Sequence, residues 1–336
     1  MFWLAWLGIV LIWDSVLRFV LLCIRALSAP LHALPFVVSA PRAFILIAAH
    51  NEAGTIGPTI RSLHEYLDEW PADIWVIADR CTDTTAAEAA AAGATVVAVR
   101  ESGRLGKGAV LAWWLEQYRS VWRDEDSLIV LDADSRLEPG SLATLREAMM
   151  SGAQVVQGFV APQAVNRAGR LAGWSEVLMQ RIDDEARLRR HWSVPLRGTG
   201  MVFQAALLAQ LAPRLHTLAE DLELDCLLAA RQTYVLFSPQ ARILDPKPQQ
   251  TAGASRQRAR WLQGQLQVLR DYPEAIGQAL LRGGAGAWFL FWLLFLRPKM
   301  LLMAVRFAVL VLAWLVGAQG LAWVMVTGLL LDAAYY

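Results

Sequence analysis

The stretch SLIVLDADS, residues 127–135, joins an apolar run to two acids, Asp132 and Asp134. An apolar run of this length is typical of a buried strand. Residues i and i+2 of an extended chain point the same way, so the two carboxylates lie on one face. Such carboxylates repel each other unless a cation or a hydrogen-bond donor lies between them. The stretch therefore predicts a strand whose carboxyl end faces a polar ligand.

Short apolar runs alternate with segments of helical spacing upstream of this stretch. The predicted strands are residues 44–49, 73–79, 94–99 and 127–132, and the predicted helices are residues 55–67, 84–92 and 107–118. Alternating strands and helices indicate a mainly parallel sheet with helices on both faces, a Rossmann-like α/β domain. Ligands of such sheets bind beyond the carboxyl ends of the strands, where Asp79, Asp132 and Asp134 fall.

The two ends of the chain are more apolar than this middle part. Hydrophobic residues make up 56% of the chain and charged residues 18%, which is apolar for a soluble protein. Residues 1–25 approach the ~20 apolar residues that cross a bilayer as a helix. Because no basic segment precedes them, we expect a transmembrane helix rather than a cleaved signal peptide. Residues 300–336 predict a second membrane region, of one spanning helix or a short hairpin of two.

Between these ends we expect a linker (residues 26–42), a catalytic domain (43–270) and interfacial helices (271–299). Arg25 and Arg42 flank the linker, which places the catalytic domain in the cytoplasm by the positive-inside rule. We therefore predict an integral protein of the bacterial inner membrane. A net charge of +1 without a basic tract argues against nucleic acid as a partner. Three cysteines without metal-type spacing argue against a disulfide framework.

Six short motifs follow one another along residues 43–270. They are AAHNE (48–52), ADRCTD (78–83), RLGKG (104–108), LDAD (131–134), AEDLEL (219–224) and QRARW (257–261). Their order resembles that of the family 2 inverting glycosyltransferases of GT-A fold. The last motif is similar to the Q-x-x-R-W of membrane-bound synthases of cellulose, chitin and hyaluronan, and of ceramide glucosyltransferases. The resemblance implies a GT-A domain that uses a UDP-sugar.

The resemblance also implies roles for the residues at the strand ends. The residues that would bind the nucleotide are His50, Asn51, Glu52, Asp79, Lys107 and Asp132. Asp134, with Asp132, would coordinate the Mg²⁺ or Mn²⁺ that bridges the phosphates, because these metals prefer carboxylate and phosphate oxygens. Helix-start chemistry is the alternative for Asn51 and Glu52, and an ordinary turn before a helix is the alternative for RLGKG.

Further residues correspond to the family's base and acceptor side. Asp221 matches the general base that takes the proton of the acceptor hydroxyl. Ala219 stands where the family usually has Thr, and a charged helix face is the alternative for the acids around Asp221. The RGTGM segment (197–201) resembles the family's glycine-bearing loop near the donor sugar and acceptor. The residues that we place at this loop and beside the base are Gly198, Thr199, Gly200 and Glu220.

The QRARW motif places three side chains on one helix face. Gln257, Arg260 and Trp261 are spaced i, i+3, i+4. An arginine there can bind phosphate oxygens through both ends of its guanidinium, and an indole offers a flat surface to a sugar ring. The alternative is an amphipathic helix on a membrane surface. The acidic run 183–185 is interpreted as packing and surface.

We expect an inverting glycosyltransferase that moves a sugar from a UDP-sugar to a lipid or glycan acceptor at the cytoplasmic membrane face. A processive polysaccharide synthase is the alternative, but two to four membrane helices are too few to line a channel unless protomers of a homo-oligomer share them. A sugar-nucleotide pyrophosphorylase needs a Gly-rich loop after the first strand, which AAHNE lacks. The joint presence of Asp134, Asp221 and Arg260 argues against an inactive adaptor.

Overall fold

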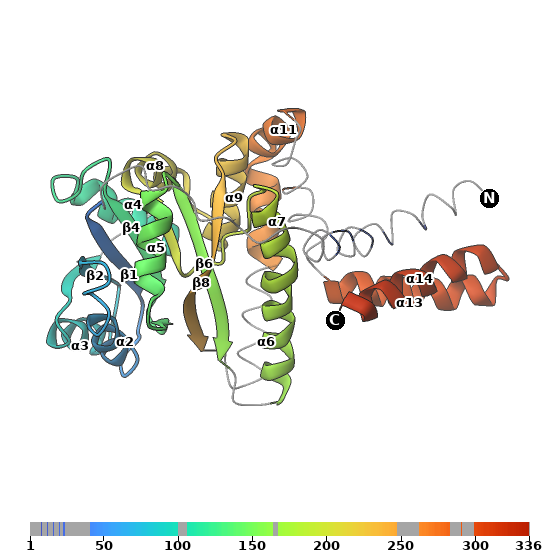
Figure 1. The fold of residues 1–336 in the computed structure, drawn as a ribbon, viewed down its shortest axis with the longest axis horizontal. Helices are drawn as coiled ribbons and strands as arrows, with labels where there is room; N and C mark the ends of the chain where they lie inside the picture. Colours follow the sequence, from blue (N-terminus) through green and yellow to red (C-terminus); the bar gives the residue numbers. More distant parts are fainter. Residues whose placement is uncertain are drawn as a thin grey trace.

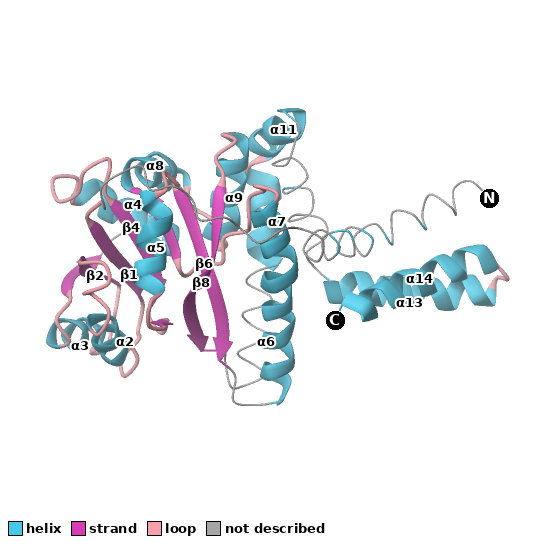
Figure 2. Ribbon diagram, in the orientation of Figure 1, coloured by secondary structure: helices cyan, strands magenta, loops and turns pink. Residues whose placement is uncertain are grey.

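The computed structural model describes residues 41–99, 106–163, 167–246, 262–282 and 299–335, with a few isolated positions outside these ranges. One eight-stranded sheet, in the order β3-β2-β1-β4-β7-β6-β8-β5, forms the centre of the main domain (Figures 1 and 2). The strands are β1 (Ala43–Ala49), β2 (Ala72–Asp79), β3 (Thr95–Val99), β4 (Ser127–Asp132), β5 (Arg136–Leu137), β6 (Val155–Gln163), β7 (Met201–Gln204) and β8 (Val235–Pro246).

The first half of the sheet is parallel, as the sequence predicts. β1 pairs in parallel with β2 and with β4, and β2 pairs in parallel with β3. Ala48 lies opposite Asp132 in the register, and Ala49 lies opposite Ala78. The carboxyl ends of β1, β2 and β4 are therefore level with one another, and the acids that follow these strands meet at one edge of the sheet.

The second half of the sheet is mixed, so the prediction of a mainly parallel sheet holds only for residues 43–132. β7 runs antiparallel to both β4 and β6, β6 and β8 are parallel, and β5 runs antiparallel to β8. A parallel neighbour of β4 would need a crossover connection, whereas β7 enters from the RGTGM loop and runs back along β4. With four residues, β7 is too short to give a clear apolar pattern.

Helices cover the sheet and supply the rest of the core. They are α2 (Ile56–His64), α3 (Thr85–Ala91), α4 (Lys107–Gln117), α5 (Ser141–Met150), α6 (Arg167–Met179), α7 (Glu185–Arg189), α8 (Ala205–Leu211), α9 (Glu220–Ala230) and α11 (Pro273–Arg282). In α2, the apolar residues Ile56, Ile60 and Leu63 are buried at helical spacing, which is why this segment packs as an amphipathic helix. The predicted helices at 55–67, 84–92 and 107–118 are confirmed as α2, α3 and α4.

Two further helices form a hairpin that lies beside the main domain (Figure 1). They are α13 (Lys299–Leu315) and α14 (Gln319–Tyr335), and the turn between them uses a positive φ of 73° at Gly317. Large apolar side chains on the hairpin stay exposed, including Trp314 at 77% and Trp323 at 71%. Gly8, an isolated described position of the N-terminal segment, lies against Leu321 and Val324 of α14. Gly8 and Ile12, two described positions of this segment, therefore lie beside α14.

The predicted membrane-spanning helices are not supported. Within the described ranges, no helix combines the length and the apolar character that crossing a bilayer requires, and this contradicts the predicted integral membrane localisation. The physical reason is length, because α13 and α14 have 17 residues each, about 26 Å at 1.5 Å per residue, against ~30 Å of hydrocarbon. Most of the predicted N-terminal helix (1–25) lies outside the described residues.

Candidate functional site

The ends of β1 and β2 are joined by side chains of the AAHNE motif. The ring Nδ1 of His50 donates to the carbonyl oxygen of Asp79 over 2.6 Å. Asn51 adopts a positive φ of 56°, and its side-chain oxygen accepts the backbone N–H of Thr82 over 2.8 Å. The motif therefore holds two strand ends in register and leaves Glu52 as the next residue at this edge.

Asp79 and Glu52 have different surroundings at this edge. Arg80 donates to both carboxylate oxygens of the buried Asp79, over 2.7 and 2.5 Å. Burial, and then the charges of Asp132 and Asp83, raise the pKa of Glu52. The charge of Asp132 therefore acts on Glu52 across the ends of β1 and β4. Negative charge therefore collects where β1 and β4 end.

Lys107, the first residue of α4, connects the end of β4 to the RGTGM loop. Its ammonium group donates to Asp132 over 2.5 Å and to the carbonyl oxygen of Gly198 over 2.6 Å. Burial lowers the pKa of Lys107, but the nearby carboxylates of Asp132, Glu220 and Asp221 raise it by more, so the net shift is upward. One cation therefore lies among the acids of β4 and those of α9.

Asp134 is a half-buried carboxylate surrounded by other acids. Burial, and then the charges of Asp132 and Asp245, raise the pKa of Asp134 to about 6. Within the described part of the chain, no three His, Cys, Asp or Glu side chains come together closely enough to hold a metal ion. Mg²⁺ typically takes one or two carboxylates and completes its shell with water and substrate phosphates. Asp132 and Asp134 fit that pattern.

The RGTGM loop is fixed against the D-x-D end of β4. Gly198 and Gly200 have positive φ angles of 78° and 65°, which glycine adopts without strain. The hydroxyl of Thr199 accepts the backbone N–H of Asp132 over 3.1 Å and lies 2.8 Å from the hydroxyl of Ser135. This loop therefore determines the direction in which the Asp132 backbone leaves the strand.

The AEDLEL motif begins α9, with Ala219 at the N-cap position. The charges of Glu220 and Asp221 act on Lys107. Burial, and then the charge of Asp221, raise the pKa of Glu220 to about 7, while Lys107 acts in the opposite direction. One carboxylate oxygen of Asp221 accepts the backbone N–H of Leu222 over 2.8 Å. The structure therefore brings Lys107, Asp132, Glu220 and Asp221 to one site, although they come from three elements.

Three buried acids were missed as parts of this site's framework. Glu223 and Asp225 of α9 are almost fully buried, and so is Asp184, which forms an ion pair with Arg197 at the start of the RGTGM segment. Asp225 accepts the backbone N–H of Leu196 over 3.2 Å. The sequence signal was available, because the acids of α9 alternate with apolar residues on every side, which is typical of a buried helix.

The predicted acceptor residues Gln257, Arg260 and Trp261 lie outside the described residues. The helical residues that follow them, 262–271, pack against the start of α9. A Cβ added to Gly264 would lie 2.6 Å from the Cβ of Ala219, so only glycine allows this close approach. Gly264 therefore lies directly beside Ala219, the residue that precedes Glu220 and Asp221.

The curled mixed sheet, with acids at the ends of β1 and β4, is an α/β fold of GT-A-like type. A family model described as glycosyl transferase family group 2 matches residues 127–336, more than half of the chain, and one described as glycosyl transferase family 2 matches residues 44–207. The chain belongs to glycosyl transferase family 2, and the protein is a glycosyltransferase. A search of curated proteins found no significant match.

A solved structure shares the fold. A mannosyltransferase of Pyrobaculum calidifontis, solved with GDP-Man and Mn²⁺, aligns with a TM-score of 0.58 over 99% of this chain and 97% of its own, at 17% identity. Mannosyl-3-phosphoglycerate synthase of Rubrobacter xylanophilus aligns with a TM-score of 0.48 over 69% of this chain and 74% of its own, at 19% identity. Glucosyl-3-phosphoglycerate synthase of Mycobacterium tuberculosis, solved with Mn²⁺, UDP and phosphoglyceric acid, aligns with a TM-score of 0.45 over 78% of this chain and 81% of its own, at 18% identity. At these identities the first likeness concerns the fold alone, and the other two carry no argument.

Proposed function

We propose that this glycosyltransferase moves a sugar from a UDP-sugar to a lipid or glycan acceptor, with inversion at the transferred carbon. The position of Lys107 carries the proposal. Its ammonium group donates to Asp132 at the end of β4. The carboxylates of Glu220 and Asp221 in α9 act on the same ammonium group and raise its pKa. Nucleotide-side acids and the candidate base therefore share one site, which transfer in a single displacement requires.

The nucleotide would bind at the level edge formed by β1, β2 and β4. The proposed contacts to uridine and ribose are His50, Asn51, Glu52, Asp79 and Asp132. Asp134, with Asp132, would hold Mg²⁺ or Mn²⁺, for which the raised pKa of Asp134 and the collected negative charge argue. A metal bound there supplies charge neutralisation for the diphosphate as it departs.

Asp221 is proposed as the general base. Its carboxylate lies in the first turn of α9, beside Glu220, and would take the proton of the acceptor hydroxyl as the new bond forms. The loop residues Gly198, Thr199 and Gly200 would lie along the donor sugar, because Lys107 bridges Gly198 to the nucleotide side.

The acceptor side is proposed for the QRARW segment. Gln257, Arg260 and Trp261 precede the helical residues 262–271, which pack on Ala219 immediately before the proposed base. This placement also supports a catalytic domain that extends over residues 43–270. The exposed apolar side chains of α13 and α14 favour a lipid over a free sugar as the acceptor.

The test is to incubate purified protein with Mn²⁺ and a panel of UDP-sugars, with GDP-mannose for comparison. Release of nucleoside diphosphate is measured with and without added membrane lipid or an oligosaccharide. We expect release from a UDP-sugar that stops on chelation of the metal. In Asp221→Asn, we expect kcat to fall by about 10³-fold while UDP binding is retained.

The products separate the rival activities. Mass spectrometry distinguishes the addition of one sugar from the growth of a polymer, which would indicate a processive synthase. Formation of nucleoside triphosphate from UDP-sugar and pyrophosphate would indicate a pyrophosphorylase. Full activity of Asp221→Asn would contradict the assignment of the base.

A further inference from the structure

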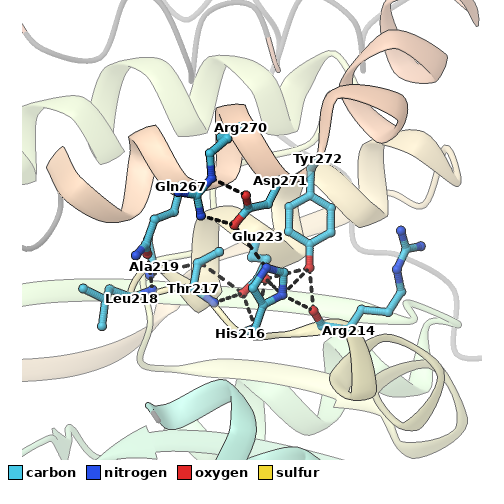
Figure 3. A network of polar contacts seen from close by, with 10 residues as sticks. All are labelled: Arg214, His216, Thr217, Leu218, Ala219, Glu223, Gln267, Arg270, Asp271 and Tyr272. Carbon is cyan, nitrogen blue, oxygen red and sulfur yellow. Dashed lines mark hydrogen bonds and ion pairs between the residues drawn. The ribbon is translucent and has the colours of Figure 1, made fainter. Parts of the chain in front are cut away.

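The first turn of α9 carries a buried carboxylate, that of Glu223. Glu223, two residues after the proposed base, has a relative exposure of 0%. Its contacts run to the loop that precedes α9, residues 214–219, and to Tyr272, at the end of the helical segment that follows QRARW (Figure 3). Two segments far apart in the sequence therefore meet on one side chain.

The loop contributes three donor groups to this carboxylate. The backbone N–H of His216 donates to Oε1 over 3.0 Å, and the backbone N–H of Thr217 donates to Oε2 over 3.1 Å. The hydroxyl of Thr217 donates to the same Oε2, also over 3.1 Å. A charged acceptor that receives several N–H and O–H donors fixes the loop backbone strongly.

Tyr272 supplies the bond from the other segment. Its hydroxyl lies 2.6 Å from Glu223 and 2.5 Å from the carbonyl oxygen of Arg214, but it has only one proton. The ring Nδ1 of His216 lies 2.8 Å from the same carbonyl and can donate to it. We therefore assign the proton of Tyr272 to Glu223, where the acceptor is charged.

A second connection runs between the same two segments. The side-chain oxygen of Gln267 accepts the backbone N–H of Leu218 over 3.1 Å, and Gly264 packs against Ala219. Every residue from His216 to Ala219 is therefore held by Glu223 or by the helical residues 262–271. The next two residues are Glu220 and Asp221, so this framework sets the position of the first turn of α9.

We propose that Tyr272 and Glu223 form a clamp that positions Asp221 relative to the acceptor side of the site. Neither residue reaches the reacting atoms in this role, so both are positioning residues. The inference rests on the proposed role of Asp221 as the base. Loss of the clamp would shift the carboxylate of Asp221 from the acceptor hydroxyl, and misplacement by about 1 Å costs about 10²-fold in rate.

Tyr272→Phe is the direct test, because it removes one hydroxyl and keeps a ring that is 5% exposed. With UDP-glucose and Mn²⁺ as the probe, we expect kcat to fall about ten- to a hundredfold, with KM for the donor within about twofold. Tyr234→Phe is the matched control, since the Tyr234 hydroxyl is buried and has no hydrogen-bond partner within the described residues. We expect it to behave as wild type.

A double mutant separates positioning from a general structural effect. If the hydroxyl acts through Asp221, adding Tyr272→Phe to Asp221→Asn should cause no further loss of rate. Additive losses would overturn the clamp, and so would a Tyr272→Phe enzyme with the kcat of Tyr234→Phe. Full activity of Asp221→Asn would instead overturn the proposed base, and the clamp with it.

Amide hydrogen exchange gives a readout that needs no activity. In Tyr272→Phe, the carboxylate of Glu223 loses the hydroxyl that fixes it, so it holds the N–H groups of His216 and Thr217 less firmly. The amides of residues 216–222 should therefore exchange faster than in wild type or in Tyr234→Phe. Unchanged exchange there would overturn the clamp. Should Tyr272→Phe fail to fold, Gln267→Met, which removes the acceptor of the Leu218 N–H, should give the same split between kcat and KM.

Discussion

The D-x-D end of β4 and the buried part of α9 use acidic side chains in opposite ways. Burial and neighbouring carboxylates raise the pKa of Asp134 to about 6, so its charged form is poorly compensated. Glu223, a few residues into α9, accepts donors from His216, Thr217 and Tyr272. The carboxylate of Asp134 is therefore poorly compensated by its surroundings, whereas that of Glu223 is satisfied by hydrogen bonds from the protein.

The difference separates acids that the protein leaves poorly compensated from acids that it satisfies with hydrogen bonds. Unsatisfied buried acids store unfavourable free energy that a bound metal or proton can release. A fully hydrogen-bonded acid has no such capacity, but it fixes the backbone that donates to it. Glu220, with a pKa raised to about 7, behaves as the first kind although it lies on the same helix as Glu223.

The largest expected effect comes from removing the satisfied acid. Glu223→Ala leaves the buried N–H groups of His216 and Thr217 without their acceptor, and we expect a loss of about 3 kcal/mol in the free energy of unfolding. Urea denaturation measures it. The exposed Glu125→Ala should change stability by less than about 0.5 kcal/mol. If both substitutions changed the free energy of unfolding equally, Glu223 would not be the stabilising acid that its hydrogen bonds indicate.

The second prediction concerns pH and an unsatisfied acid. The folded-state pKa of Glu220, about 7, lies above its ordinary value of 4.5. Its contribution to stability is therefore present below pH 4.5 and is lost as the pH rises through about 7. The Glu220→Gln side chain stays neutral at every pH. The free energy of unfolding of this variant, minus that of wild type, should therefore be larger at pH 8 than at pH 4.5, by on the order of 2 kcal/mol. A stability difference that does not vary with pH would contradict this.

The smallest expected effect compares two glycines of similar conformation. Gly198 has a φ of 78° in the RGTGM loop, and Gly140 has a φ of 81° before α5. Alanine at either position should cost about 1 kcal/mol of stability through backbone strain. Only Gly198→Ala should also lower kcat, because the Gly198 carbonyl receives Lys107. Thermal denaturation and nucleotide release measured together would show it, and parallel changes in both variants would contradict it.

The parallel half of the fold could be predicted because each element carries its own local pattern. The strand Ala43–Ala49 is apolar throughout and is buried on both faces, and its neighbour β4 is buried up to Asp132. The antiparallel pairings of the mixed half could not be predicted in this way, because β7 has four residues and β5 has two. Their positions depend on long-range pairing, which local patterns do not record.

The site shows the same division. The strand-end acids Asp132 and Asp134 could be placed from spacing, because the carboxyl ends of parallel strands lie at one edge. Tyr272 contacts Glu223 and His216, which lie 49 and 56 positions earlier in the chain. No sequence motif predicts contacts over such separations. The short helices α13 and α14 were misinterpreted because apolar composition was given more weight than length.

The most direct test of the central claim is calorimetry of UDP binding with and without Mn²⁺. The account predicts that Asp134→Asn binds UDP at least about tenfold more weakly than wild type when Mn²⁺ is present, because a metal ligand is lost. Asp221→Asn should bind UDP as wild type does. Metal-dependent binding of wild-type strength in Asp134→Asn, or its loss in Asp221→Asn, would contradict the account.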